Sequence, residues 1–79
     1  MPNIKVYSTT TCPYCVTLKD FLKANNIAFE EVDVSFDVEK QQEMIAKSGQ
    51  MGVPVVDIDG QIIVGFDRER IIQILNINN

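Results

Sequence analysis

Residues 4–15 read Ile-Lys-Val-Tyr-Ser-Thr-Thr-Thr-Cys-Pro-Tyr-Cys and carry the pattern of a short strand, a polar loop and the start of a helix. The segment Ile4 to Ser8 favours a strand, because β-branched and aromatic side chains are common there. Pro13 suits the first turn of a helix, where its missing N–H is not needed. The pattern therefore predicts a strand-to-helix turn with Cys12 and Cys15 at the start of the helix.

Apolar residues at helical spacing predict three helices in the chain. The first is expected from Pro13 to about Asn25. The second follows a cap at Ser35 or Asp37 and ends at about Ser48, and the third follows a cap at Asp67. The apolar residues that recur on the first and third helices are Cys15, Leu18, Phe21, Leu22, Ile71, Ile72 and Leu75. In the second helix, the residues expected to face inward are Val38, Met44 and Ile45.

Three more strands are expected after the first helix, at Ala28 to Val34, Val53 to Ile58 and Gln61 to Val64. The last two are joined by Asp59-Gly60, a favoured two-residue hairpin turn. The resulting order, β-α-β-α-β-β-α, predicts an α/β chain with the thioredoxin fold, a four-stranded mixed sheet flanked by three helices. With no repeat or linker in view, residues 1–79 are expected to form a single domain.

The composition of the chain is that of an ordinary globular domain. Of the 79 residues, 46% are hydrophobic and 23% charged, and the net charge is −4. The basic residues are scattered, so no nucleic-acid partner is expected. No stretch is long and apolar enough to span a membrane, and the N-terminus lacks signal-peptide features. We therefore expect a cytoplasmic monomer without a membrane partner.

Cys12 and Cys15 are the only cysteines, and the chain has no His. A structural disulfide is disfavoured, because closing so short a loop is worth only about 2 kcal/mol and a reducing cytosol keeps it open. A structural zinc ion normally takes four ligands, so zinc would require a dimer bridged by four thiolates. Redox chemistry is the favoured interpretation of the C-x-x-C spacing, with the zinc-bridged dimer and incidental cysteines as alternatives. No metal is expected in the single chain.

The position of Cys12 suits a nucleophile, since a thiol attacks a disulfide only as the thiolate. Unpaired backbone N–H groups and the helix dipole favour negative charge at a helix start. The dipole contributes only about 0.3–1 kcal/mol, so hydrogen bonds from the Tyr14 and Cys15 N–H groups and the Cys15 thiol are expected to add to it. We expect Cys12 to form the mixed disulfide and Cys15, with an ordinary or raised pKa, to resolve it. Tyr14 is expected either to flank the sulfur or to be a solvated aromatic.

The second half of the chain supplies candidate binding residues. The Val53 backbone could pair with a substrate strand if the bond before Pro54 were cis, although a trans proline is the commoner case. Gly65 permits close backbone approach, and the N-terminus of the last helix can hold a carboxylate. Asp67 is expected either to cap that helix or to contact a ligand.

Taken together, these motifs resemble those of glutaredoxins: C-P-Y-C at residues 12–15 after a Tyr-Ser strand end, Val53-Pro54, and Gly65-x-Asp67 before the last helix. The resemblance covers nearly the whole chain. It implies a thiol–disulfide oxidoreductase that reduces protein disulfides and glutathione mixed disulfides. Glutathione would be a co-substrate and not a bound cofactor, and the bond before Pro54 would be cis.

The resemblance also implies a docking site for glutathione. Its cysteine backbone would lie on Val53, and its glycine carboxylate near Gln41 and Tyr14. The residues implied for its γ-glutamyl end are Gly65, Phe66 and Asp67.

Departures from the family pattern suggest alternative functions. Thr9 stands where glutaredoxins usually have a lysine for the glycine carboxylate, and Gly52 where they usually have a threonine. Gly65-Phe66 also resembles redoxins that donate electrons to ribonucleotide reductase and are recharged by the flavoprotein thioredoxin reductase. The main alternative is therefore such a redoxin, serving that or another enzyme. A dimer holding an iron–sulfur cluster is a minor alternative, because cluster-binding glutaredoxins usually have Gly in place of Pro13.

Overall fold

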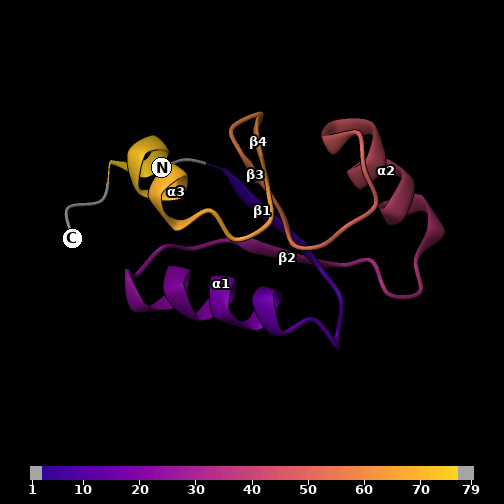
Figure 1. Ribbon diagram of the computed structural model, residues 1–79, viewed down its shortest axis with the longest axis horizontal. Helices are drawn as coiled ribbons and strands as arrows, with labels where there is room; N and C mark the ends of the chain where they lie inside the picture. Colours follow the sequence, from indigo (N-terminus) through magenta and orange to yellow (C-terminus); the bar gives the residue numbers. More distant parts are fainter. Residues whose placement is uncertain (1–2, 77–79) are drawn as a thin grey trace.

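The computed structural model describes residues 3–76, and its helices and strands follow the predicted order β-α-β-α-β-β-α (Figure 1). In chain order they are β1 (Ile4–Ser8), α1 (Pro13–Ala24), β2 (Glu30–Asp33), α2 (Val38–Ser48), β3 (Val55–Ile58), β4 (Gln61–Val64) and α3 (Arg68–Leu75).

The four strands of the described chain form one mixed sheet in the order β2-β1-β3-β4. Strand β1 is parallel to β2 and antiparallel to β3, which is itself antiparallel to β4. A parallel pair needs a crossover and an antiparallel pair only a tight turn, so α1 joins β1 to β2 while Asp59-Gly60 joins β3 to β4. Asp59 and Gly60 both have positive φ, as a type I′ hairpin turn requires. The predicted thioredoxin fold is confirmed.

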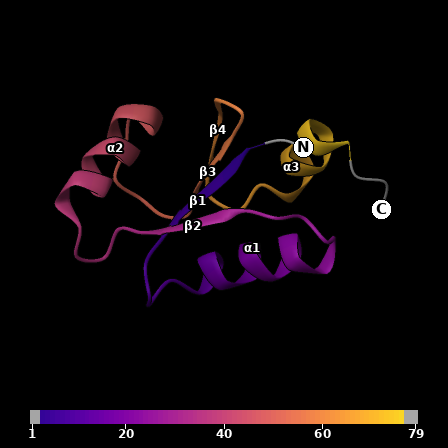
Figure 2. The same cartoon turned by 180° about the vertical axis from the view of Figure 1, so that it is seen from behind.

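Helices cover both faces of the sheet, with α1 and α3 on one face and α2 on the other (Figures 1 and 2). Successive side chains of a strand point to opposite faces. Accordingly, Val6 packs with α1 and α3, while its neighbour Tyr7 packs with α2.

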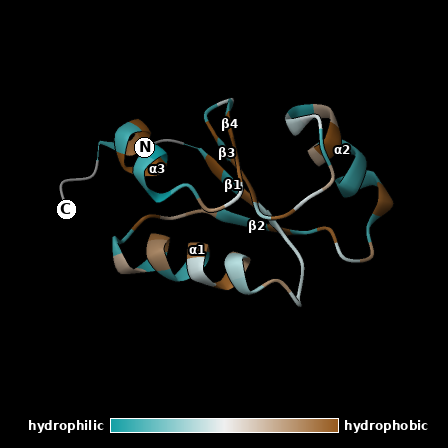
Figure 3. Ribbon diagram, viewed as in Figure 1, coloured by the Kyte–Doolittle hydropathy of each residue, from teal (hydrophilic) through white to brown (hydrophobic). Residues whose placement is uncertain are grey.

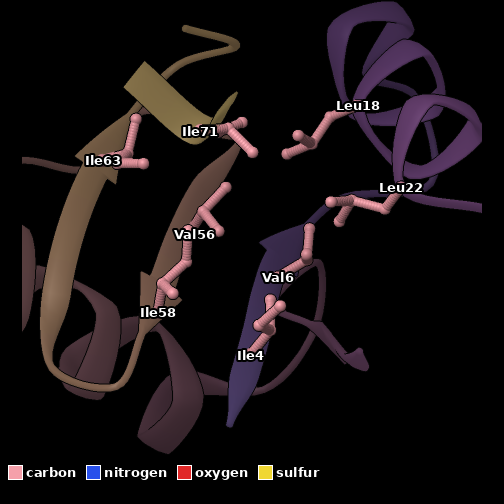
Figure 4. Close-up of a cluster of buried hydrophobic side chains, with 8 residues drawn as sticks. All are labelled: Ile4, Val6, Leu18, Leu22, Val56, Ile58, Ile63 and Ile71. Carbon is pink, nitrogen blue, oxygen red and sulfur yellow. The ribbon is translucent and has the colours of Figure 1, made fainter. Parts of the chain in front are cut away.

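The larger hydrophobic cluster lies between the sheet and helices α1 and α3 (Figure 4). Its buried side chains are Ile4, Val6, Leu18, Leu22, Val56, Ile58, Ile63 and Ile71. Leu18 and Leu22 are four residues apart, so both lie on the same face of α1. Burying a leucine or isoleucine side chain stabilises the fold by about 1.5–3 kcal/mol. This cluster therefore fixes the position of α1 and of the two cysteines at its start.

A smaller cluster, formed by Tyr7, Val32, Val34, Met44 and Val55, holds α2 against the opposite face. Tyr7 is fully buried, and its hydroxyl donates to the carboxylate of Glu43 and accepts a hydrogen bond from Lys47 Nζ over 2.9 Å. The same ammonium group lies 2.7 Å from the Asp57 carboxylate. Helix α2 is thus held by apolar packing at Met44 and by a polar network through Lys47.

The structure corrects several details of the predicted elements. Val38 was expected to face inward but is 62% exposed, because it begins α2 and burial in that helix is concentrated at Met44. Strand β3 begins at Val55 and not at Val53, since Pro54 has no N–H to donate to a strand partner. Strand β2 is also shorter than predicted, because only residues 30–33 pair with β1.

Each helix carries both hydrophilic and hydrophobic segments (Figure 3), as expected for helices that pack one side on a sheet. None of the helices in the described part of the chain has the length and apolar character needed to cross a membrane.

Candidate active site

Cys12 is the N-cap residue of α1, with φ −93° and ψ 111° in the extended region. Pro13 follows it as the first helical residue, as the sequence predicts. The backbone N–H of Cys15 donates a hydrogen bond to Cys12 Sγ over 3.3 Å. Cys12 therefore takes the N-cap position, where Ser, Thr or Asp usually stands. Its sulfur accepts a hydrogen bond from one of the N–H groups of the first turn that have no partner within the helix.

The two cysteines differ in exposure and in acidity. Cys12 is half-buried, whereas Cys15 is fully buried on the inner side of α1. Burial, and after it the hydrogen bond to Cys12, raises the pKa of the Cys15 thiol to about 11. Cys15 therefore stays protonated at neutral pH, as expected of a resolving cysteine, and both thiols are free.

The loop before β3 lies next to Cys12. The Val53–Pro54 peptide bond is cis, which confirms what the family resemblance implied. The Cys12 thiol lies 3.9 Å from the carbonyl oxygen of Val53, to which it donates a long hydrogen bond. Pro54 is buried, and its carbonyl oxygen accepts from the Gly65 N–H over 2.8 Å. These contacts bring together four of the predicted site residues: Cys12, Val53, Pro54 and Gly65.

The segment Gly65-Phe66-Asp67 connects β4 to α3. Gly65 has φ +79°, a conformation that residues with a Cβ rarely adopt. The Phe66 ring packs on Phe21 with centroids 5.8 Å apart, and Asp67 caps α3 by accepting from the Arg70 N–H over 3.2 Å. The cap role expected for Asp67 is confirmed, while its ligand role stays a prediction.

Tyr14 and Gln41 lie on different elements. Tyr14 is 69% exposed at the start of α1, as expected of a solvated aromatic, and its role beside the Cys12 sulfur stays a prediction. Gln41, on α2, donates from Nε2 to the carbonyl oxygen of Val34 over 2.6 Å. Its side chain thus lies close to the end of β2, on the opposite side of the sheet from α1.

A pocket of about 190 Å³ joins Gln41 to Val53. It is lined by Thr9, Val34, Ser35, Gln41, Met44, Ile45, Met51 and Val53, and we call it the Met51 pocket. The sequence singles out Gln41, Val53 and Thr9, but no motif in it indicates the apolar part of this lining. The nearest signal was Met51, an exposed methionine placed two residues before Val53.

Within residues 3–76, no three or more Cys, His, Asp or Glu side chains lie close enough together to hold a metal ion. The described site has two thiols, one at a helix start and one buried beneath it.

Comparison with known proteins agrees with this geometry. A model of the glutaredoxin family matches residues 4–63. A glutaredoxin-like 8.6 kDa protein of the rubredoxin operon of Clostridium pasteurianum is 52% identical over 68 residues, covering 86% of this chain and 91% of that protein. Glutaredoxin 3 of Escherichia coli is 39% identical over 67 residues, covering 85% and 81%.

Solved structures show the same fold. The crystal structure of a mutant of the thioredoxin-like protein BC3987 superposes with a TM-score of 0.90 at 41% identity, covering 99% of this chain and all of that one. The resemblance inferred from the motifs is confirmed, and the chain belongs to the glutaredoxin family of thiol–disulfide oxidoreductases.

Proposed function

We propose that this chain reduces protein disulfides and glutathione mixed disulfides through the dithiol Cys12–Cys15, with glutathione as the reductant. The observation that carries the proposal is the pairing of a half-buried Cys12 Sγ, hydrogen-bonded to a helix-start N–H, with a buried and protonated Cys15. The helix start favours the thiolate that attacks, and burial keeps the Cys15 thiol protonated. The cycle uses no bound cofactor, and we propose that a monomer performs it in the cytoplasm.

The reaction balances as two consecutive exchanges. The Cys12 thiolate attacks one sulfur of a substrate disulfide, forms a mixed disulfide with it and releases the other sulfur as a thiolate. Cys15 loses its proton and attacks Cys12 Sγ, which releases the bound substrate thiolate and leaves a Cys12–Cys15 disulfide. Two electrons have then passed to the substrate, whose two thiolates take up two protons. Two glutathione thiols return the enzyme to the dithiol and leave as glutathione disulfide.

A docking position for glutathione on this site follows from the same residues. The Val53 N–H has no hydrogen-bond acceptor within residues 3–76, and its carbonyl oxygen faces Cys12. Both groups are available to a cysteine held in extended conformation. The γ-glutamyl end would then lie at Gly65, Phe66 and Asp67, and the glycine end near Gln41 and Tyr14.

One observation favours a second candidate, a redoxin recharged by a flavoprotein reductase. The Met51 pocket, at the proposed glycine end, is lined by uncharged residues and offers no cation to a carboxylate. Burying a carboxylate without a partner is costly. A reductant that has no carboxylate at this position would avoid this cost.

A recycling assay separates these two candidates. The enzyme, a small mixed disulfide and NADPH are combined with glutathione and glutathione reductase in one arm, and with thioredoxin reductase in the other. The proposal predicts turnover in the glutathione arm, and turnover only in the thioredoxin reductase arm would replace it with the redoxin. Visible absorption by the purified protein would instead indicate an iron–sulfur cluster.

A further inference from the structure

The lining of the Met51 pocket is uncharged and largely apolar. Its wall is formed largely by the apolar side chains of Met44, Ile45, Met51 and Val53, and no Asp, Glu, Lys or Arg lines it. Its volume of about 190 Å³ is enough for one aliphatic side chain. Met51 itself is 73% exposed, which leaves an adaptable thioether at the rim.

Val53 links this pocket to the reactive sulfur. Its carbonyl oxygen lies 3.9 Å from Cys12 Sγ, and its side chain lines the pocket. Cys12 begins α1, on one face of the sheet, whereas Met44 and Ile45 belong to α2, on the other. Helices α1 and α2 cover opposite faces of the sheet (Figure 1). The thiol at the start of α1 and the pocket beside α2 therefore lie toward opposite faces.

An extended peptide paired with Val53 would reach both places at once. Its successive side chains point to opposite faces. A substrate cysteine directed at Cys12 therefore directs its neighbour toward the α2 face. In antiparallel pairing, the commoner kind, the residue that follows the cysteine passes alongside Gly52 and Met51. The N–H and carbonyl groups of Gly52 are hydrogen-bonded to the side chain of Gln50, so the backbone pairing with the peptide is made by Val53.

We infer that the Met51 pocket binds the apolar side chain of the residue that follows the reactive cysteine in a protein substrate. This inference rests on the proposed role of Cys12. It makes the preferred substrate a polypeptide with a Cys-Leu or Cys-Met sequence. Glutathione has glycine after its cysteine, so it brings no apolar side chain to the pocket.

The test uses symmetric disulfides of the capped peptides acetyl-Gly-Cys-Xaa-Gly-amide, with Xaa as Leu, Gly or Asp. A symmetric disulfide presents the same peptide whichever sulfur Cys12 attacks. The second-order rate constant is measured for one turnover of the pre-reduced enzyme, which needs no external donor. Each constant is divided by that of dithiothreitol with the same peptide, which removes intrinsic differences in reactivity.

The variants Met51→Lys and Val38→Lys complete the test. Both replace an exposed apolar side chain by lysine, but Val38 does not line the pocket. We expect the wild type to react with the Leu peptide roughly ten-fold faster than with the Gly peptide, the effect of burying one aliphatic side chain. Met51→Lys should lower this ratio to about three-fold or less and favour the Asp peptide, whereas Val38→Lys should keep the wild-type ratio.

Each other outcome contradicts the inference. Equal rates for the Leu and Gly peptides in the wild type, with Cys12-dependent turnover of both, overturn the pocket assignment and leave the proposed function standing. A Leu preference that Met51→Lys leaves unchanged also overturns it. No reaction with any peptide overturns both the inference and the proposed function.

Discussion

The backbone N–H of Cys15 points at the sulfur of Cys12, 3.3 Å away, across the first turn of α1. The same residue that supplies this hydrogen bond carries the second thiol, buried below the first. One helical turn therefore provides the group that stabilises a Cys12 thiolate and the group that later attacks its mixed disulfide. The two-residue spacing of C-x-x-C allows both.

Serine substitutions should separate the roles of the two thiols. Cys12→Ser removes the nucleophile, so turnover of both glutathione mixed disulfides and intramolecular protein disulfides should be abolished. Cys15→Ser keeps the backbone N–H that donates to Cys12 Sγ. It should spare the reaction with glutathione mixed disulfides, while stopping the reduction of intramolecular disulfides. Steady-state turnover of both substrate types measures this, and full activity of Cys12→Ser would show that the nucleophile is wrongly assigned.

Alkaline pH should weaken the reduced fold through Cys15. Because burial and the hydrogen bond to Cys12 raise the pKa of Cys15 to about 11, the fold favours the protonated thiol. The contribution of the Cys15 thiol to the stability of the fold is fully present below the pKa that this thiol has in the unfolded chain. It is lost as the pH rises toward about 11. The shift corresponds to about 2–3 kcal/mol. Urea unfolding of reduced wild type and Cys15→Ala at about pH 8 and about pH 11 measures the difference.

The comparison with Cys15→Ala cancels other groups that titrate in this range, such as Tyr7, whose pKa is also raised, chiefly by burial. The stability advantage of the wild type over Cys15→Ala should shrink by about 2–3 kcal/mol between about pH 8 and about pH 11. A constant advantage would mean that Cys15 titrates like a thiol in the unfolded chain.

Two ion pairs of equal length should differ in their contribution to stability. Lys47–Asp57 and Lys19–Glu31 both measure 2.7 Å, but the Asp57 side chain is 14% exposed and that of Glu31 46%. Burial alone would raise the pKa of Asp57, yet Lys47 and the Gly60 N–H outweigh it and lower that pKa. Lys47→Met removes the cation beside Asp57 and one of the hydrogen-bond partners of the Tyr7 hydroxyl, and should cost about 1–3 kcal/mol.

The matched control for that variant is Lys19→Met, which breaks a pair of the kind that contributes about 0–1 kcal/mol at a surface. Free energies of unfolding in denaturant at neutral pH measure both variants. Equal losses would indicate that the network of Tyr7, Lys47 and Asp57 is no stronger than a surface pair.

Asp67 allows the cap role to be separated from a ligand role. Asp67→Ala removes the hydrogen bond to the Arg70 N–H and should destabilise the fold by about 1 kcal/mol. Asp67→Asn keeps a capping oxygen and should retain most of the stability. If the carboxylate also binds the γ-glutamyl end of glutathione, Asp67→Asn should raise KM for glutathione at unchanged stability. An unchanged KM would leave Asp67 as a cap only.

Local sequence patterns were sufficient for the order of the elements and for the start of α1. Pro13 and the spacing of Leu18 and Leu22 locate that helix, and Asp59-Gly60 locates the hairpin. The apolar pattern of α2 predicted the face that packs on the sheet but not how far along the helix burial extends, and Val38 is exposed. A periodic pattern of apolar residues predicts which face of a helix is buried, but it does not predict which turns of that helix the sheet covers.

The candidate site was only partly predictable for a similar reason. Cys12 and Cys15 lie within one turn, so their relationship follows from their spacing. The Met51 pocket draws on separate segments, at Thr9, Gln41 and Met51, that become neighbours only after α2 packs on the sheet. The cis bond before Pro54 followed from the family resemblance alone, since single X-Pro bonds are mostly trans.

The central claim is that the start of α1, through the Cys15 N–H, makes Cys12 the reactive thiol. The rate of alkylation of Cys15→Ala by iodoacetamide, measured from about pH 5 to about pH 9, tests it, because only Cys12 can react. The same variant unfolded in urea supplies the reference. The folded protein should react faster than the unfolded chain at about pH 7, where only a few per cent of an unfolded thiol is ionised. Coincident profiles for the folded and unfolded chains would contradict the account.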